Sequence, residues 1–454
     1  MFREKSKTHP HPFILPTISC YNEDIQALMV ECLLAFQIRN IILHLHFASV
    51  TFFTDIFGGY DSVMNTIICA SVACSQEFFE NHFNESGALP GQAVQKYNRL
   101  IIEGLAKNQD ILVETVTSVP VSRATNINFF YKGKTENKND ITWNYLPYIN
   151  IKWIRDISTV VFSFVKGIKL CANREKVCII ADVLNAPVAL GTYLASRVKK
   201  KKYVISITDD PVLCGCGKAY YTTSNYLIRK SDAYIFITEA MREKYQVGDK
   251  KSIIIEGLVD VNENATSNPK EKTNSNKFIV MYTGSIHKIY GIDNLVKAFI
   301  DANISDSELH IYGDGDYRDT LIDICKKNKS VVYHGTVLSS KIIEIQKYAS
   351  LLVNPRPIED EYTKYSFPSK NMEYMVSGTP VLTTDLPGMP QEYKEYVFII
   401  EDYSIEGIKD KLCEIASMDK KELMKVGQRA REFVLNKKNN IVQAGKIVEM
   451  IYSL

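Results

Sequence analysis

The sequence predicts an α/β protein made of two Rossmann-like domains with parallel sheets. Short apolar runs alternate with longer amphipathic segments, which is the pattern of βαβ units. The alternation stops at residues 262–276, NENATSNPKEKTNSN, and then begins again. This polar stretch has no apolar period and is typical of an interdomain linker. With 454 residues, the chain is long enough for two domains that each bury a core.

The first domain is expected at residues 64–261 and the second at residues 277–435. Strands of the first domain are expected at Thr66 to Val72, Ile111 to Val116, Val177 to Ala181, Tyr203 to Ile207, Ala233 to Ile237 and Ser252 to Ile255. Strands of the second are expected at Phe278 to Tyr282, Glu308 to Tyr312, Val331 to Tyr333, Leu351 to Val353, Val381 to Thr383 and Val397 to Ile400. Within residues 436–454, the amphipathic segment Asn439 to Tyr452 predicts a closing helix.

The first 63 residues fit this alternation poorly. Ile25 to Phe53 is an apolar run that charged and histidine side chains interrupt, and its uncharged stretches are too short to cross a bilayer. We interpret residues 1–63 as an extension outside the core, with an interfacial helix as the alternative. Met64 is expected to be the natural start, because a strand-like run follows it at once.

Net charge and cysteine content indicate which partners and which redox environment to expect. Lys and Arg number 54 and Asp and Glu 52, so the formal net charge is only +2. No domain-wide basic field is available for phosphates, which argues against nucleic acid as a partner. Ten cysteines show no metal-ligand pattern, and no secretory signal is apparent. Reduced thiols in a cytoplasm are therefore expected.

The most informative segment is Tyr365 to Gly388, YSFPSKNMEYMVSGTPVLTTDLPG. It predicts a loop, a helix, a glycine stop at Gly378 and a strand, which is one αβ step of a parallel sheet. Glu373 lies on a helix face with methionines on either side. Such a carboxylate is either an exposed bystander or an acceptor for a pair of ligand hydroxyls, with a phosphate on the nearby amides.

Five motifs together resemble the retaining glycosyltransferases of family four. KNMEYMVSGTPVL resembles their donor-binding helix, in which a glutamate accepts from both ribose hydroxyls; Glu373 takes that place. The other motifs are YTGSIHKIYGIDNLVKAF, LHIYGDGDYRDTL, VVYHGTV and YIFITEAM. The resemblance covers roughly residues 64–454. It implies the GT-B fold, in which two Rossmann-like domains face each other across a cleft and the last helix returns to the N-terminal domain.

The resemblance implies transfer of a sugar from a nucleoside-diphosphate sugar to a saccharide or lipid-linked saccharide, with retention. YSFPSK is typical of a branch that builds bacterial cell-surface polysaccharide, such as capsule or lipopolysaccharide. Two departures stand out: Tyr365 replaces a second glutamate, and Ser285 and Tyr290 replace a basic pair. A GT-B sugar-nucleotide epimerase and a non-catalytic partner of another transferase remain alternatives.

Ligands of parallel sheets bind beyond the carboxyl ends of the strands. Donor-binding candidates are Gly284, Ser285, His287, Tyr333, Ser366, Phe367, Ser369 and Glu373. Ser366 or Ser369 could cap the helix, and the free amides there favour an anion. Lys288 and Lys370 are expected to stabilise the leaving diphosphate. An ordinary capped helix with an exposed Lys370 is the alternative.

Acceptor-side candidates lie in the first domain. Asp182 follows a strand and is the leading catalytic residue by resemblance, with a helix-capping role as the alternative. Gly91 and Gln92, in the loop GALPGQ, and Asp210 are expected at the acceptor.

The basic run Arg197 to Lys202 could contact anionic lipid at the inner face of the cytoplasmic membrane, or could be a solvated helix end. The sequence has no DxD-type acidic cluster in the appropriate place, so no metal and no other cofactor is expected.

Overall fold

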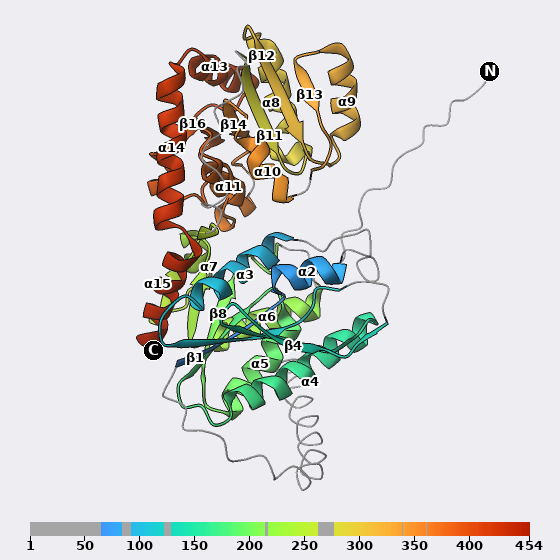
Figure 1. Cartoon of the computed structure of the whole chain (residues 1–454), viewed down its shortest axis with the longest axis vertical. Coiled ribbons are helices and arrows are strands. Elements are labelled where there is room, and N and C mark those ends of the chain that lie inside the picture. The colour runs from blue at the N-terminus through green and yellow to red at the C-terminus, as the bar shows by residue number, and fades with distance from the viewer. Residues whose placement is uncertain are drawn as a thin grey trace, which may run out of the picture. The chain divides into compact units, whose positions relative to one another are not determined.

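The structure is a computed structural model that describes residues 65–83, 92–121, 129–213, 217–261, 277–337, 339–359 and 361–454 (Figure 1). The chain divides into two compact units, Met1–Ser62 and Val63–Leu454, and all described residues belong to the second. The predictions of an extension at residues 1–63 and of a linker at residues 262–276 therefore fall outside the described residues.

The described residues between 65 and 261 form the N-lobe, whose sheet has the strand order β10-β9-β8-β7-β1-β2-β5-β4. Its strands are β1 (Asn65–Ser71), β2 (Ile111–Thr117), β4 (Lys134–Lys138), β5 (Ile141–Tyr145), β7 (Val177–Asp182), β8 (Lys202–Ile207), β9 (Ala233–Phe236) and β10 (Ser252–Ile254). All neighbours pair in parallel except β4, which is antiparallel to β5. A separate antiparallel pair joins β3 (Phe130–Tyr131) to β6 (Tyr148–Ile149).

The expectation of a purely parallel first sheet was therefore wrong at its edge. β4 has the sequence KTENK and is largely exposed, so it carries no apolar run that would mark it as a strand. An edge strand needs only one hydrogen-bonded neighbour, and charged side chains are common there.

Helices cover both faces of this sheet. They are α2 (Gln76–Phe83), α3 (Gln92–Leu105), α4 (Lys152–Cys171), α5 (Ala186–Val198), α6 (Lys218–Lys230) and α7 (Glu239–Tyr245). Side chains of a strand alternate between the two faces, so consecutive β1 residues enter different cores: Ile67 packs in one and Ile68 in the other. Among the described helices, none has the length and apolar character that crossing a bilayer requires.

The C-lobe begins at residue 277, and its six strands are all parallel, in the order β13-β12-β11-β14-β15-β16 (Figure 1). Its strands are β11 (Phe278–Thr283), β12 (Ser307–Tyr312), β13 (Val331–Tyr333), β14 (Leu351–Asn354), β15 (Val381–Thr384) and β16 (Phe398–Ile400). Its helices are α8 (Ile292–Ala302), α9 (Arg318–Lys327), α10 (Ser339–Gln346), α11 (Ser369–Ser377), α12 (Gln391–Lys394), α13 (Ile405–Ala416) and α14 (Lys420–Lys437), with 3-10 turns η3 (Lys288–Tyr290) and η4 (Glu361–Tyr365). The order reverses between β11 and β14, which is where doubly wound sheets bind ligands.

The chain then returns to the N-lobe through α15 (Asn440–Tyr452). Ala444 and Ile447 of α15 belong to the same buried cluster as Leu105 of α3. The crossing is held by backbone bonds, since Val259 N–H donates to the Lys438 oxygen at 3.1 Å and Asn440 N–H donates to the Val259 oxygen at 2.9 Å. The amphipathic closing segment thus buries its apolar face against α3.

Gly104 allows α3 and α15 to approach closely. A Cβ at Gly104 would lie 2.1 Å from the backbone oxygen of Asn440. We predict that Gly104→Ala lowers the free energy of unfolding by about 1–3 kcal/mol, because the two helices must move apart. The measurement is urea denaturation. Gly445→Ala is the matched control, because the nearest atom to its Cβ lies at 3.8 Å; an equal loss in both variants would contradict the prediction.

Candidate active site

Glycines form the floor of the site at the carboxyl edge of the C-lobe sheet. Gly284 N–H donates to the Tyr312 oxygen at 2.9 Å, and Gly313 N–H donates to the Gly335 oxygen at 2.8 Å. The φ angles are +142° at Gly284 and +140° at Gly313, and a Cβ on Gly313 would lie 1.8 Å from the Gly284 oxygen. Only residues without a side chain allow the loops after β11 and β12 to pack this closely.

The side chain of Lys370 lies across Gly284. A Cβ on Gly284 would stand 2.2 Å from Lys370 Nζ, which donates to Tyr282 Oη at 2.8 Å. Burial lowers the pKa of Lys370 to about 8; Glu373 opposes this shift, and Arg356 adds to it. The ammonium group thus bonds a phenol, in a place that penalises its charge unless an anion joins it.

Arg356 follows β14 on the other side of the switch point. Its guanidinium carbon lies 5.5 Å from the centre of the Tyr290 ring and 4.7 Å from that of the Tyr362 ring. Its positive charge acts on Lys370 and also on Asp209 in the N-lobe, because it contributes a downward shift to the pKa of each group. Two cations therefore flank the place where the strand order reverses.

Glu373 is oriented from behind by a buried amide. Gln346 Nε2 donates to Thr283 Oγ1 at 2.9 Å and to Glu373 Oε1 at 3.3 Å, and Gln346 is fully buried. The hydroxyl of Tyr374 donates to the Thr283 oxygen at 2.9 Å and accepts from Thr283 N–H at 3.0 Å. These bonds fix α11 to the end of β11. No sequence signal identified Gln346, which closes an ordinary amphipathic helix.

One cavity of about 670 Å³ connects these groups with the N-lobe helices α2 and α3. The cations that line it are Lys96, Arg99, Lys347 and Lys370, and the carboxylates are Glu344 and Glu373. The surplus of positive charge suits a diphosphate, and the N-lobe supplies half of the cations. Lys96 and Arg99 were not anticipated, because α3 has the composition of a common surface helix.

Among the predicted donor-binding and catalytic residues, Gly284, Lys370 and Glu373 line this cavity. Ser285 and Lys288 are exposed and do not line it. His287 is half-buried, and its Nδ1 lies 3.4 Å from Asp316 Oδ2; the same carboxylate accepts from Lys288 N–H at 3.0 Å. This turn is thus tied to the loop after β12, and its role toward a diphosphate stays a prediction.

Other predicted donor residues support the site from outside the cavity. Tyr333 Oη donates to the Gly313 oxygen at 2.8 Å, which anchors the glycine floor. Phe367 is buried in the C-lobe core, with its ring centre 5.3 Å from that of Tyr393.

The expectation that Ser366 or Ser369 caps α11 was wrong. Pro368 is the N-cap residue and no side chain bonds the first turn; Ser369 is already helical, and its N–H donates to the Phe367 oxygen at 2.9 Å. Because the preceding loop folds back on the helix start, a backbone carbonyl takes the place of a side-chain cap.

Asp182 ends β7 and is almost completely buried, at 2 % exposure. It accepts from Asn98 Nδ2 at 2.8 Å and from Leu184 N–H at 3.0 Å, and burial raises its pKa. The residue that caps α5 is Asn185, and Asp182 instead holds the turn before it. Asp182 does not line the cavity, so its catalytic role stays a prediction.

The neighbours Asp209 and Asp210 differ in burial and in their ion pairing. Asp210 is 2 % exposed, and its Oδ2 lies 2.5 Å from Lys244 Nζ, so Lys244 neutralises its negative charge. Asp209 is half-buried; burial and the nearby Asp182 raise its pKa to about 6, against the influence of Arg356. The sequence could not distinguish these neighbours, because only the path of the chain decides which carboxylate turns inward.

Residues of the predicted acceptor loop lie partly outside the described residues. Gly91 is not described; Gln92 opens α3, and its side chain is not described.

Tyr365, which replaces the family's second glutamate, packs against the N-lobe. Lys244 Nζ lies 4.3 Å from the centre of its ring, and the ring joins the edge of a buried N-lobe cluster. Lys244 thus contacts both Asp210 and Tyr365. An aromatic ring at this position makes an interlobe contact instead of offering a carboxylate to a ligand.

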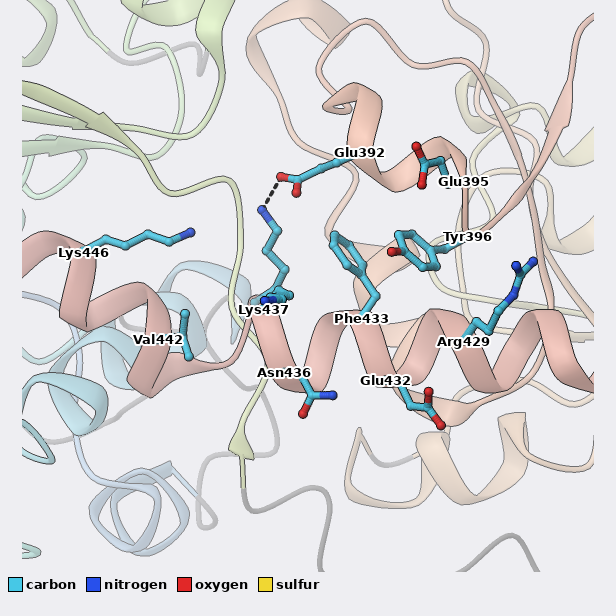
Figure 2. A pocket seen from close by; sticks show the side chains of 11 residues that line it. Glu392, Glu395, Tyr396, Arg429, Glu432, Phe433, Asn436, Lys437, Val442 and Lys446 are labelled. Atoms are coloured by element: carbon cyan, nitrogen blue, oxygen red, sulfur yellow. Dashed lines mark hydrogen bonds and ion pairs between the residues drawn. The ribbon is translucent and has the colours of Figure 1, made fainter.

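A second cavity, of about 710 Å³, lies where α12, α14 and α15 meet (Figure 2). Its charges are mixed: Glu392, Glu395 and Glu432 face Arg429 and several lysines. Lys438 Nζ lies 2.6 Å from a Glu392 oxygen, which the dashed line in Figure 2 marks, and it also pairs with the buried Glu256. Its buried cation is therefore already neutralised within the protein.

Residues 263–433 match the family model of the glycosyl transferases group 1. Among solved structures, sucrose-phosphate synthase from Thermosynechococcus elongatus is similar over 86 % of this chain and 99 % of its own, with 15 % identity and a TM-score of 0.59. HepE of Anabaena in complex with UDP is similar over 86 % and 100 %, with 14 % identity and a TM-score of 0.59. A trehalose-6-phosphate protein from E. coli, bound with UDP-2-fluoro glucose, is similar over 86 % and 99 %, with 10 % identity and a TM-score of 0.62.

The curated proteins contain no match to this chain. The fold is GT-B, as the five motifs implied, and it consists of two Rossmann-like lobes. The chain thus combines a GT-B fold with a glycosyl transferases group 1 domain that forms most of its C-lobe.

Lys370 is expected to reduce stability while it is charged. Its pKa is lowered from 10.5 to about 8, so the cost is complete below pH 8 and disappears as the pH rises past 10.5. We predict that Lys370→Met raises the free energy of unfolding at pH 7 by on the order of 2 kcal/mol, with the gain shrinking toward pH 10. Denaturant titrations at several pH values measure this. Lys364→Met, at an exposed lysine of η4, is the control, and a less stable Lys370→Met at every pH would refute the prediction.

Proposed function

We propose that the protein transfers a sugar from a nucleoside-diphosphate sugar to a saccharide or lipid-linked saccharide acceptor. The observation that carries this proposal is the close approach of Lys370 to Gly284, with Glu373 in the same cavity. Gly284 leaves room for the end of Lys370, and the ammonium group of Lys370 bonds only a neutral phenol, that of Tyr282, so an anionic phosphate would supply its counter-charge. Gln346 holds Glu373, which we assign as the acceptor for ribose hydroxyls.

The geometry suggests how such a site would work. Negative charge grows on the diphosphate as the sugar leaves, and Lys370 and Arg356 lie where they would stabilise it. Arg99 lines the same cavity from the N-lobe, so movement of the lobes would tighten the site and exclude water. Asp182 would act from the N-lobe through its contacts. Because Lys244 already neutralises Asp210, we assign the acceptor to the neighbouring carboxylate, Asp209.

The finer assignment rests on resemblance. Resemblance to family four implies retention, and the YSFPSK segment supports a role in cell-surface polysaccharide synthesis. We propose that the reaction needs no metal or other cofactor because the sequence has no DxD-type cluster in the appropriate place, and that it takes place on the cytoplasmic side of the membrane. HepE of Anabaena, which shares the fold, has been solved with UDP and with UDP-glucose, so UDP is a reasonable first probe here.

The expected lipid contact at Arg197 to Lys202 is weakened by internal bonds. Arg197 Nη2 pairs with Asp232 at 2.6 Å, and Lys201 Nζ donates to the Arg174 oxygen at 2.6 Å.

A donor and acceptor screen tests the proposal. Labelled nucleoside-diphosphate sugars are incubated with the protein, with and without saccharide and lipid-linked acceptors. Transfer that requires an acceptor supports the proposal. A changed nucleotide sugar without any acceptor would identify an epimerase, and binding without turnover of any donor would identify a non-catalytic partner.

Glu373 is predicted to bind the ribose. Glu373→Gln should weaken nucleotide binding by about 1.5–3 kcal/mol, the range for hydrogen bonds to a charged group. Isothermal titration with UDP measures the change. Glu344→Gln is the matched control, because Glu344 lines the same cavity but is exposed and lies on α10. Equal affinities of wild type and Glu373→Gln would remove Glu373 from the site.

Asp209 is predicted to shape the pH profile. Its pKa of about 6 means that it loses its charge as the pH falls through 6. If the charged carboxylate receives the acceptor, kcat/KM for the acceptor should fall below pH 6 in the wild type and become flat over this range in Asp209→Asn, at a lower level. Donor affinity serves as the internal control. If kcat/KM of Asp209→Asn still falls below pH 6 as in the wild type, the fall is due to the titration of another group.

A further inference from the structure

A third cavity lies on the N-lobe and is lined by residues on and beside β4, β5 and α4. It has a volume of about 520 Å³. Four of its lining residues are lysines, namely Lys132, Lys134, Lys166 and Lys169, and no carboxylate lines it. Val161 and Val165 of α4 form part of an apolar wall. We call this cavity the lysine groove.

The acidic groups near the lysine groove are already engaged. Glu136 lies 2.8 Å from Lys134 Nζ and also accepts from Tyr145 Oη at 2.8 Å. Glu114, which is buried, lies 2.5 Å from Arg174 Nη2. Within the described residues, the ion pairs of the structure include none made by Lys132, Lys166 or Lys169.

Lys166 shows the consequence of this imbalance. It is half-buried on α4, and burial lowers its pKa; Glu114 opposes this shift and Lys169 adds to it. Lys438, at the meeting of α14 and α15, is buried between two carboxylates. An anion from outside would supply to Lys166 the counter-charge that Lys438 finds within the protein.

We propose that the lysine groove is a binding site for a phosphate group, separate from the cavity at Gly284. Lys132, Lys166 and Lys169 hold the phosphate oxygens, and the valine wall accepts an apolar portion of the same ligand. The groove lies on the lobe that the proposed function assigns to the acceptor. Its Tyr145 bonds Ser75 at 3.2 Å, and the next residue, Gln76, lines the main cavity.

Titration with pyrophosphate tests this site. Wild type should show two binding events; Lys166→Ala/Lys169→Ala should weaken one of them about tenfold, because two charge-assisted contacts are lost. Lys370→Ala should weaken the other. Lys420→Ala/Lys421→Ala, at exposed lysines of α14, matches the change in net charge and should change neither. Binding by Lys166→Ala/Lys169→Ala that equals the wild type overturns the proposal.

Two further arms identify the source of the phosphate. Vesicles of phosphatidylglycerol and phosphatidylcholine are sedimented with the protein, and vesicles of phosphatidylcholine alone serve as the reference. Sedimentation that depends on phosphatidylglycerol and on Lys166 and Lys169 indicates a lipid headgroup, and pyrophosphate binding without it indicates a free phosphate; sedimentation that the double variant leaves intact opposes the proposal.

If Lys166→Ala fails to fold, Lys132→Ala/Lys169→Ala, at two exposed lysines, repeats both tests. Because neither arm measures sugar transfer, failure here is distinct from failure of the proposed function.

Discussion

The candidate site depends on the absence of a side chain at Gly284. The space that a Cβ would occupy holds the end of Lys370, and the Gly284 oxygen occupies the space that a Cβ on Gly313 would need. The loops after β11 and β12 and the start of α11 can therefore converge on one point. This convergence places a cation, glycine backbone and Glu373 together at the point where the strand order reverses.

Three lysines of this chain differ in how far a carboxylate within the protein neutralises their buried charge. Lys438 is 4 % exposed and pairs with Glu256 of the N-lobe and Glu392 of the C-lobe, so it links the two lobes. Burial lowers the pKa of Lys370, which is deeply buried, and also that of Lys166, which is half-buried. A buried charge without a partner is expensive, and this expense is the physical reason to look for ligands at both.

Interlobe contacts explain one departure from the family pattern. Tyr365 contacts Lys244, which in turn neutralises Asp210. A carboxylate in place of Tyr365 would compete with Asp210 for this single ammonium group. The tyrosine allows the loop before α11 to rest on the N-lobe without that competition, and it leaves Lys370 and Arg356 as the cations at the switch point.

The sequence by itself determined the alternation of strands and helices, because local patterns encode it. Its five motifs implied, by resemblance, the GT-B fold and the grouping of Gly284, Lys370 and Glu373, which line one cavity. Only the tertiary structure decided which N-lobe residues face the cavity, which of them are buried, and how the N-lobe sheet ends. It brought Arg99 to the cavity, buried Asp210 while leaving Asp209 half-buried, and added the polar edge strand β4. These outcomes depend on long-range packing between lobes and across sheet edges. Such packing leaves no period in the sequence, since a residue's partner there is many residues away.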